Sequence, residues 1–264
     1  MQSMDRIYSP DFWELFDRLD TSLSPAGPEQ LYELAAPFLP AGGHVLDVGC
    51  RDAHHLIRLV SLTAGSGVGI DPVAWHVDRA RTAVTEAHLT DRIEIVLGVA
   101  ESIPSPDDAF DLVWCRDVIE VLPDLTRAFG EMARVIKAGG ILVAYTNVLN
   151  GSPNDEENRA IHYPLGNNPD SLVEATLERA LAESGFSVDV KHVVGTEWRE
   201  HLEETGGIAS RDVLRLARLR RQQQAIVDAY GEQVFATAQA STQWSIHQFL
   251  GRFVPTIYIL RWST

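Results

Sequence analysis

The sequence predicts an α/β fold, doubly wound, in which a mostly parallel sheet is covered by helices on both faces. Short apolar runs of strand length alternate along the chain with segments whose apolar residues recur at helical spacing. The first strand, at 44–48, leads through Gly49 into a helix, which is how a strand–helix–strand unit begins. About twenty residues later a second apolar strand again ends in an acid, Asp71.

The elements follow one another at regular spacing. Strands are expected at 44–48, 67–71, 93–97, 110–115, 141–146, 187–194 and 253–261. Helices are expected at 29–39, 53–64, 73–88, 124–136 and 171–184, the last with Ser171 as its cap and Gly185 as its stop. Residues 137–140 are expected to form a turn, and 147–170 a long polar loop rich in Asn, Pro and Gly.

This pattern divides the chain into three regions. Residues 1–40 are expected to form an N-terminal helical lid, although a helix packed on the body would have the same pattern. Residues 41–195 and 252–264 form the ligand-binding core. Residues 196–251 are helical throughout and form an insert that serves either as a lid or as the surface of a homodimer.

Composition and charge narrow the range of partners. The chain has 264 residues and a formal net charge of −15 at pH 7, which offers little attraction to nucleic-acid phosphates or to an anionic membrane. Two cysteines make no disulfide framework, the first residues lack a signal-peptide pattern, and no apolar run has membrane-spanning length. We therefore expect a cytoplasmic protein that acts on a small molecule, with neither nucleic acid nor membrane as a partner.

The turn after the first strand predicts a nucleotide site. The N-terminus of the following helix offers unpaired backbone N–H groups, and Gly49 lets a ligand approach the backbone closely. An acid at the end of the neighbouring strand, here Asp71, accepts hydrogen bonds from ribose hydroxyls in nucleotide-binding folds. The sequence thus predicts an adenosine-containing ligand at the carboxyl ends of these two strands.

Five short motifs carry a resemblance to a known family. They are Val-Leu-Asp-Val-Gly-Cys (45–50), Gly-Ile-Asp (69–71), Ala-Glu-Ser-Ile-Pro (100–104), Phe-Asp-Leu-Val (110–113) and Lys-Ala-Gly-Gly-Ile-Leu (137–142). In order and spacing they resemble class I S-adenosylmethionine-dependent methyltransferases. The resemblance implies a Rossmann-like, seven-stranded sheet whose antiparallel last strand, 253–261, lies between the fifth strand and 187–194. A nicotinamide dehydrogenase would need Gly-x-Gly-x-x-Gly after the first strand, and this chain lacks the second glycine.

The resemblance also implies a cofactor, S-adenosyl-L-methionine, and residues that hold it. Asp47 is expected to hold the methionine amine or a water, and Asp71, beside Pro72, the ribose hydroxyls. Val99 replaces the family's usual acid, so Glu101, Ala100 or a backbone carbonyl is expected to recognise the adenine amine. The residues expected beside the methionine part or the substrate are Gly49, Cys50, Cys115, Arg116 and Asp117.

Arg51 departs from the family pattern, which commonly has glycine there. One interpretation is that its guanidinium reaches the cofactor carboxylate, and the other is that it pairs with Asp52 or Asp117. If Arg51 filled the site instead, the domain would be a degenerate, non-catalytic binding protein.

Methyl transfer to a nucleophile that must lose a proton is helped by a general base. His162 and His247 are the candidate catalytic residues, and a structural histidine is the alternative for each. The residues expected to line the substrate cavity are Tyr8, Trp13, Asn147, Tyr163 and Trp244. Glu156, Glu157 and His162 lack a standard ligand spacing, so no metal is predicted.

These residues predict methylation of an O, N or C nucleophile on a small metabolite, in natural-product biosynthesis by analogy with the family. The same cofactor motifs are compatible with non-methylating chemistry, namely cyclisation, lyase chemistry or aminocarboxypropyl transfer.

Overall fold

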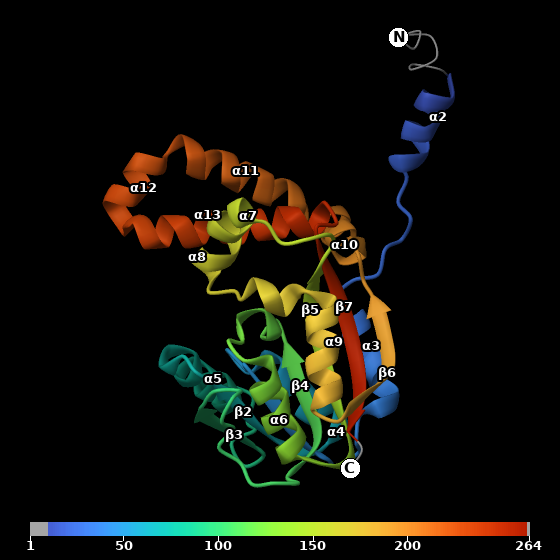
Figure 1. Cartoon of the computed structure of the whole chain (residues 1–264), viewed down its shortest axis with the longest axis vertical. Coiled ribbons are helices and arrows are strands. Elements are labelled where there is room, and N and C mark those ends of the chain that lie inside the picture. Colours follow the sequence, from blue (N-terminus) through green and yellow to red (C-terminus); the bar gives the residue numbers. More distant parts are fainter. Residues whose placement is uncertain (1–9, 263–264) are drawn as a thin grey trace.

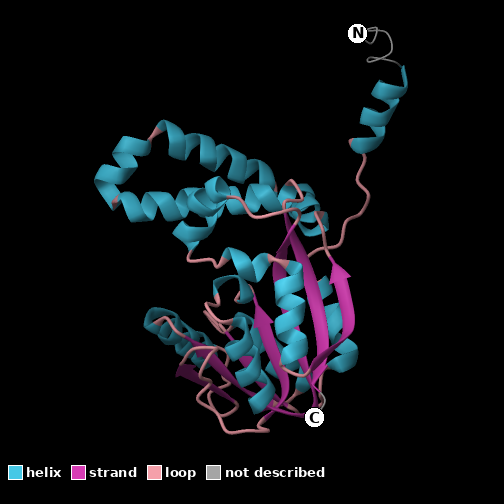
Figure 2. Ribbon diagram, viewed as in Figure 1, coloured by secondary structure: helices cyan, strands magenta, loops and turns pink. Residues whose placement is uncertain are grey.

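The computed structural model describes residues 10–262, apart from the side chains of four residues at the N-terminal end: Pro10, Phe12, Trp13 and Asp17. Seven strands form one sheet in the order β3-β2-β1-β4-β5-β7-β6 (Figures 1 and 2). They are β1 (His44–Val48), β2 (Ser66–Asp71), β3 (Ile93–Leu97), β4 (Phe110–Arg116), β5 (Ile136–Leu149), β6 (Phe186–Val193) and β7 (Phe253–Trp262). Only β7 is antiparallel to its neighbours, β5 and β6, so the predicted fold and the predicted place of the last strand are confirmed.

Helices cover both faces of the sheet because neighbouring strand residues point to opposite sides. On one face Val45 packs with residues of α3 (Gln30–Ala35), α4 (His54–Thr63) and α5 (Ala74–Glu86). On the other face Leu46 and Val48 pack with α6 (Leu125–Val135) and α9 (Glu174–Glu183). Two apolar cores therefore sandwich the sheet, as the alternation of strands and helices predicts.

The residues between β6 and β7 form four helices, as predicted for 196–251. They are α10 (Glu197–Gly206), α11 (Ile208–Arg221), α12 (Gln223–Tyr230) and α13 (Glu232–Phe249). In Figure 1 this insert lies beyond the end of the sheet at which β6 finishes, and α11 runs beside α13. A role as a lid or as a dimer surface stays a prediction.

Three predicted local features are wrong. The segment 147–170 is no open loop: β5 continues to Leu149, because Val148 and Leu149 are buried and pair with Val254 and Phe253 of β7. Short helical turns then follow, namely α7 (Asp155–Glu157), the π-turn η3 (Asn158–His162), α8 (Tyr163–Leu165) and η4 (Pro169–Leu172). The turn at 137–140 is an irregular excursion inside β5, where the pairing with β4 shifts.

The helix predicted at 171–184 begins three residues later than expected, as α9. Its first capping position is Val173, whereas Ser171 is buried in η4. The Ser171 hydroxyl donates to the carbonyl of Leu122 at 3.3 Å, a partner distant in sequence that local capping rules do not reveal.

The N-terminal helix α2 (Pro10–Leu19) stands clear of the sheet in Figure 1, and its Leu15 and Leu19 side chains are exposed. In this arrangement α2 covers no part of the core, and the lid stays a prediction. Trp13 lies on this helix with its side chain outside the described part, and Tyr8 lies outside the described residues altogether. Within residues 10–262 there is no helix that is both long and apolar enough to cross a membrane.

Candidate active site

A crevice of about 580 Å³ opens at the carboxyl ends of β1 and β2. Its volume lies within the range of small-molecule sites, roughly 300–1,000 Å³. Seven of the residues predicted from the sequence line it: Gly49, Arg51, Asp71, Pro72, Ala100, Glu101 and Asp117. Further lining residues that we did not predict are apolar and come mainly from the segment after β4 and from α8: Val118, Val121, Leu122, Pro123 and Leu165.

Gly49 and Asp71 meet at the floor of this crevice. In the parallel register Val48 lies opposite Ile70, so the next residue of each strand is adjacent to that of the other. The N–H groups of Gly49 and Cys50 both donate to the carbonyl of Ile70, at 2.8 and 2.9 Å. Gly49 has φ +73°, and a Cβ there would lie 2.3 Å from Cγ2 of Val118. The turn therefore requires glycine both for its backbone conformation and for space.

Asp71 is held rigidly and is only 4% exposed. Its Oδ1 accepts from the N–H of Val73 at 2.9 Å and lies 3.1 Å from Nδ1 of His76. Its Oδ2 accepts one hydrogen bond, from the N–H of Arg51 at 3.0 Å. Because a carboxylate oxygen has two lone pairs, Oδ2 keeps an acceptor position that fits a ribose hydroxyl.

The Arg51 side chain leaves the crevice open. It is 72% exposed, and its guanidinium lies 3.3 Å from Oδ2 of Asp52. Of the two interpretations of Arg51, the structure therefore shows the pairing with Asp52. The obstruction that would make the domain a degenerate binding protein is absent from the described residues.

Glu101 provides an unpaired acceptor at another wall of the crevice. Its Oε1 is buried and has no hydrogen-bond partner among the described residues, which is costly unless a ligand donates to it. An adenine amino group is such a donor, so Glu101 fits the predicted role. The neighbouring Val99 and Ala100 give this wall apolar surface.

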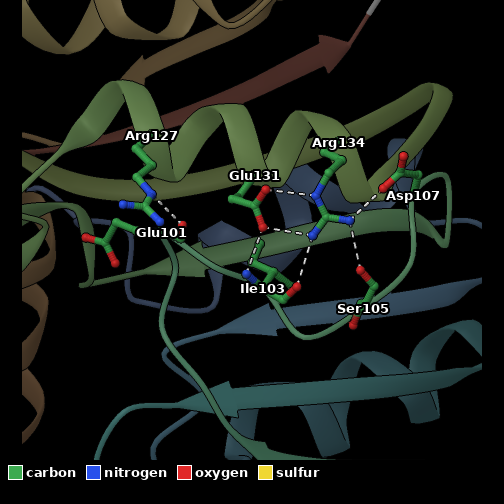
Figure 3. Close-up of polar contacts among 7 residues, drawn as sticks. All are labelled: Glu101, Ile103, Ser105, Asp107, Arg127, Glu131 and Arg134. Atoms are coloured by element: carbon green, nitrogen blue, oxygen red, sulfur yellow. Dashed lines mark hydrogen bonds and ion pairs between the residues drawn. The ribbon is translucent and has the colours of Figure 1, made fainter.

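The segment that carries Glu101 is fixed to α6 by two arginines (Figure 3). Arg127 donates to the carbonyl of Glu101 at 2.9 Å. Arg134 donates to the carbonyls of Ile103 and Ser105, and it pairs with Glu131 and with Asp107. The guanidinium fork of Arg134 thus organises the turn that follows the adenine wall.

Replacing Arg134 is expected to loosen this wall. Arg134→Ala leaves two carbonyls and two carboxylates without their donor, so we expect the free energy of unfolding to fall by about 1–3 kcal/mol. Urea unfolding monitored by circular dichroism measures this loss. Arg127→Ala, which removes a donor to a single carbonyl, is the control and should cost less. Equal losses in the two variants would contradict the role given to Arg134.

Acidic residues gather at the end of the crevice formed by the segment after β4. Asp117 lines it with a side chain that is 56% exposed, and Arg116 donates to its Oδ2 at 3.2 Å. Enclosure by surrounding protein nevertheless raises the pKa of Asp117, against the lowering effect of Arg116. Glu120, in the turn η2 (Ile119–Val121), is 4% exposed, and burial followed by the charge of Asp117 raises its pKa. Sequence reasoning missed Glu120, although an acid between Ile119 and Val121 was a usable signal.

A hydrogen-bonded chain joins Glu120 to the helical insert. The backbone N–H and the side-chain amide of Asn147 both donate to Oε1 of Glu120 at 2.9 Å. Gln248 of α13 donates to Oδ1 of Asn147 at 2.6 Å and accepts from Nε of Arg199 on α10 at 2.8 Å. Asn147 is therefore buried behind Glu120 and bridges it to Gln248, and its predicted contact with substrate stays a prediction.

Four residues predicted beside the cofactor lie behind the crevice: Asp47, Cys50, Cys115 and Arg116. Cys50 and Cys115 are buried thiols whose pKa burial raises, so they act as apolar packing. Arg116 contacts His55 at 3.1 Å and lies over the Tyr145 ring at 5.3 Å. Cys115 packs into the core on one face of the sheet, whereas Arg116, the next residue of β4, lies on the opposite face with Tyr145, a detail that the motif alone does not specify.

Asp47 is a buried acid with one unpaired oxygen, Oδ2. Burial raises its pKa to about 8, although a hydrogen bond from the backbone N–H of Leu56 lowers it in part. In the native protein Asp47 therefore holds its proton at pH values where the unfolded chain, with an ordinary pKa near 4, has lost it. Stability should accordingly fall as pH rises from about 4 to about 8.

Asp47→Asn tests this linkage. The amide cannot ionise, so we expect the fall in unfolding free energy between pH 5 and pH 8 to shrink by a few kcal/mol. The measurement is urea unfolding at several pH values, with the wild type beside the variant. An unchanged pH slope would show that Asp47 is ionised in the folded protein.

The candidate catalytic histidines lie outside the crevice. His162 is 0% exposed and packs against Trp244 and Phe253, and burial lowers its pKa. His247 stacks on Phe253, and its Nδ1 lies 2.8 Å from the carbonyl of Gln243. Trp244 belongs to the same apolar cluster, whereas Tyr163 is exposed. The structure therefore places these residues outside the crevice, in a buried apolar cluster or, for Tyr163, at the surface, and their catalytic or substrate-binding roles stay predictions.

A metal-ligand cluster is also absent from the part of the chain that the structure describes. Glu157, weighed as a ligand, is paired with Arg252 at 2.8 Å, and that ion pair uses the oxygens a cation would need.

Comparison of the chain with known proteins identifies a matching family and several relatives. Residues 46–144 match a family described as "Methyltransferase domain". The 27-O-demethylrifamycin SV methyltransferase of Amycolatopsis mediterranei is 30% identical over 179 residues, which are 67% of this chain and 59% of that protein. The chain spans about six-tenths or less of the length of the curated relatives that it matches.

Solved structures share the fold. The [4+2]-cyclase SpnF superposes with a TM-score of 0.70 at 24% identity, covering 89% of this chain and 82% of that one. Geranyl diphosphate C-methyltransferase from Streptomyces coelicolor A3(2), solved with Mg²⁺, geranyl-S-thiolodiphosphate and S-adenosyl-L-homocysteine, gives 0.65 at 17% identity, covering 88% and 74%. At these identities the likeness shows a common fold.

Proposed function

Because this chain belongs to the class I S-adenosylmethionine-dependent methyltransferases, we propose that it transfers a methyl group to an O, N or C nucleophile of a small metabolite. The observation that carries the proposal is the crevice in which Gly49 and Asp71 meet beside an unpaired Glu101 oxygen. The cofactor, S-adenosyl-L-methionine, supplies an electrophilic methyl on a sulfonium. The chain's own residues bind it, exclude water and orient the acceptor, and such alignment alone accounts for much of the rate enhancement of a displacement.

The acceptor end of the crevice is bounded by apolar residues of two segments, Val118 and Leu122 after β4 and Leu165 of α8. Apolar walls with few polar groups favour a largely apolar metabolite over a peptide or nucleic acid. The rifamycin relative suggests a hydroxyl of a natural product as the first acceptor to test. Arg116 and Arg199, which are half-buried near this end, already have partners, so a diphosphate acceptor is less well supported.

Two measurements test the proposal in turn. Calorimetry with S-adenosyl-L-methionine and S-adenosyl-L-homocysteine should detect binding of both at micromolar to submillimolar concentration. The protein is then incubated with a panel of hydroxylated, aminated and unsaturated natural products, and S-adenosyl-L-homocysteine is quantified by mass spectrometry. Failure of both cofactor forms to bind would contradict the proposal.

A second candidate function follows from the SpnF likeness. That protein is named a [4+2]-cyclase, so the same fold supports chemistry other than methylation. A cyclase of this kind would form its product without consuming S-adenosyl-L-methionine. Detection of an isomerised product by mass spectrometry, without formation of S-adenosyl-L-homocysteine, would support this second function.

A further inference from the structure

We propose that His55 is a positioning residue for the cofactor. It orients Arg116, and Arg116 in turn holds the Asp117 carboxylate where that carboxylate can bind the ammonium group of the methionine part. His55 is not among the residues that line the crevice, so it acts only through these two neighbours. The inference rests on the proposed function, because it takes the crevice to be the cofactor site.

Asp117 is the acid of the crevice that the nucleoside leaves without a partner. Three acids line the crevice, and Asp71 fits the ribose hydroxyls while Glu101 fits the adenine amine. The methionine part carries an ammonium group, with which a carboxylate forms charge-assisted hydrogen bonds. Asp47, the acid that the family resemblance assigns to this amine, lies behind the crevice, and burial raises its pKa to about 8. Asp117 is therefore the better placed carboxylate.

One oxygen of Asp117 is anchored and the other is left for a ligand. Its Oδ2 accepts from Nε of Arg116 at 3.2 Å, and no donor from the described part of the chain reaches Oδ1. The backbone of Asp117 has φ +56°, and its N–H donates to the carbonyl of Tyr145 at 3.0 Å. A left-handed conformation in a residue other than glycine is costly and is found mainly at functional sites.

His55, the second residue of α4, binds the other end of the same guanidinium group. Its Nε2 lies 3.1 Å from Nη1 of Arg116. Because a guanidinium can only donate, Nε2 is the acceptor and the ring proton is on Nδ1. Nδ1 therefore donates to the hydroxyl of Tyr32 on α3. Burial lowers the pKa of His55 to about 3, so the ring is neutral, as this arrangement requires.

The surroundings of Arg116 provide no substitute for the His55 acceptor. The guanidinium lies over the rings of Tyr145 and Trp198, at 5.3 and 6.0 Å, and these two rings are stacked 4.9 Å apart. Ring faces attract a cation, but they do not fix the direction of its N–H groups. Without Nε2 of His55, one N–H of Arg116 would be left unpaired in a half-buried position. The guanidinium would then turn, and Asp117 would lose its anchor.

Two ligands separate this role from a general loss of stability. S-Adenosyl-L-homocysteine and 5′-methylthioadenosine share the adenosine and the sulfur, and only the first carries an ammonium group. His55→Phe keeps an aromatic ring beside Trp114 and removes the acceptor. We expect the dissociation constant of S-adenosyl-L-homocysteine to rise about tenfold and that of 5′-methylthioadenosine to change by less than about twofold. Isothermal titration calorimetry of the full chain measures both.

Further variants assign the effect to the proposed contacts. His55→Gln should restore most of the affinity, because an amide oxygen can accept from Arg116 while the NH₂ group donates to Tyr32. This rescue also decides if the wild type binds 5′-methylthioadenosine too weakly to measure. His54→Phe, the same change at an exposed neighbour on α4, is the control and should bind both ligands like the wild type.

Arg116→Lys carries the test if His55→Phe does not fold. A lysine is a single point donor and cannot reach His55 and Asp117 together, so the selective loss of S-adenosyl-L-homocysteine binding should appear here too. Asp117→Asn, which removes the exposed carboxylate itself, should show the same selectivity.

The outcomes that reject the inference differ from those that reject the proposed function. Equal losses of the two ligands in His55→Phe, or no rescue by His55→Gln, would give His55 a structural role only and leave the proposed function standing. Unchanged binding of S-adenosyl-L-homocysteine in His55→Phe or Arg116→Lys would have the same meaning. If the wild type bound no S-adenosyl-L-homocysteine, the inference and the proposed function would both be wrong.

Discussion

Gly49→Ala is expected to weaken the binding of S-adenosyl-L-homocysteine by at least about 100-fold, or 2.8 kcal/mol. The new Cβ would lie 2.3 Å from Cγ2 of Val118, and Val118 lines the crevice. A β-branched side chain has few rotamers to escape into, so the segment after β4 must move. The acceptors on Asp71 and Glu101 would stay in place while the wall that carries Val118 moved. The crevice would then no longer match the shape of the ligand. Isothermal titration calorimetry measures the loss.

A matched control separates the clash from the backbone penalty. Gly139→Ala introduces the same strain, because Gly139 has φ +75°, but nothing lies within 4 Å of its added Cβ. Both variants should lose about 1–2 kcal/mol of stability from the left-handed conformation, and only Gly49→Ala should lose affinity. Val118→Ala in the Gly49→Ala background should restore part of the binding. Full affinity in Gly49→Ala would contradict the crevice as the cofactor site.

Asp71→Asn is expected to lower the affinity for S-adenosyl-L-homocysteine by about 100-fold or more. Hydrogen bonds to charged groups are each worth about 1.5–3 kcal/mol, and the ribose presents two hydroxyls to this carboxylate. The substitution should also lower the stability of the protein, because Oδ1 accepts from the backbone N–H of Val73 and Oδ2 from that of Arg51. Whichever way the amide is oriented, its NH₂ group faces one of these donors.

The control is Asp78→Asn on α5. That side chain is 78% exposed and lies 3.8 Å from Arg81, so its loss should change neither affinity nor stability by more than a few tenths of a kcal/mol. The affinities are compared by calorimetry and the stabilities by urea unfolding. Wild-type affinity in Asp71→Asn would show that the ribose is held elsewhere.

The predicted general base illustrates where local pattern reasoning stops. A histidine near an aromatic residue in a polar segment looked available, yet His162 is enclosed by Trp244 and Phe253, which follow it by more than eighty residues. Glu120 looked like an ordinary acid in a short turn, and it is buried because Asn147 of β5, itself held by Gln248 of α13, donates to it. Burial of a single polar side chain depends on partners that periodicity does not identify.

The sequence by itself determined the sheet, the place of the last strand and the meeting of Gly49 with Asp71. These follow from local rules. The spacing of apolar residues along the chain determines whether a segment forms a strand or a helix, and adjacent parallel strands end at the same edge of the sheet. The tertiary structure alone decided that Arg51 turns toward Asp52, that Asp47 is buried and that Glu120 is buried and hydrogen-bonded to Asn147. Those outcomes depend on side-chain direction and on packing between distant segments, where a shift of one residue exchanges the interior for the crevice.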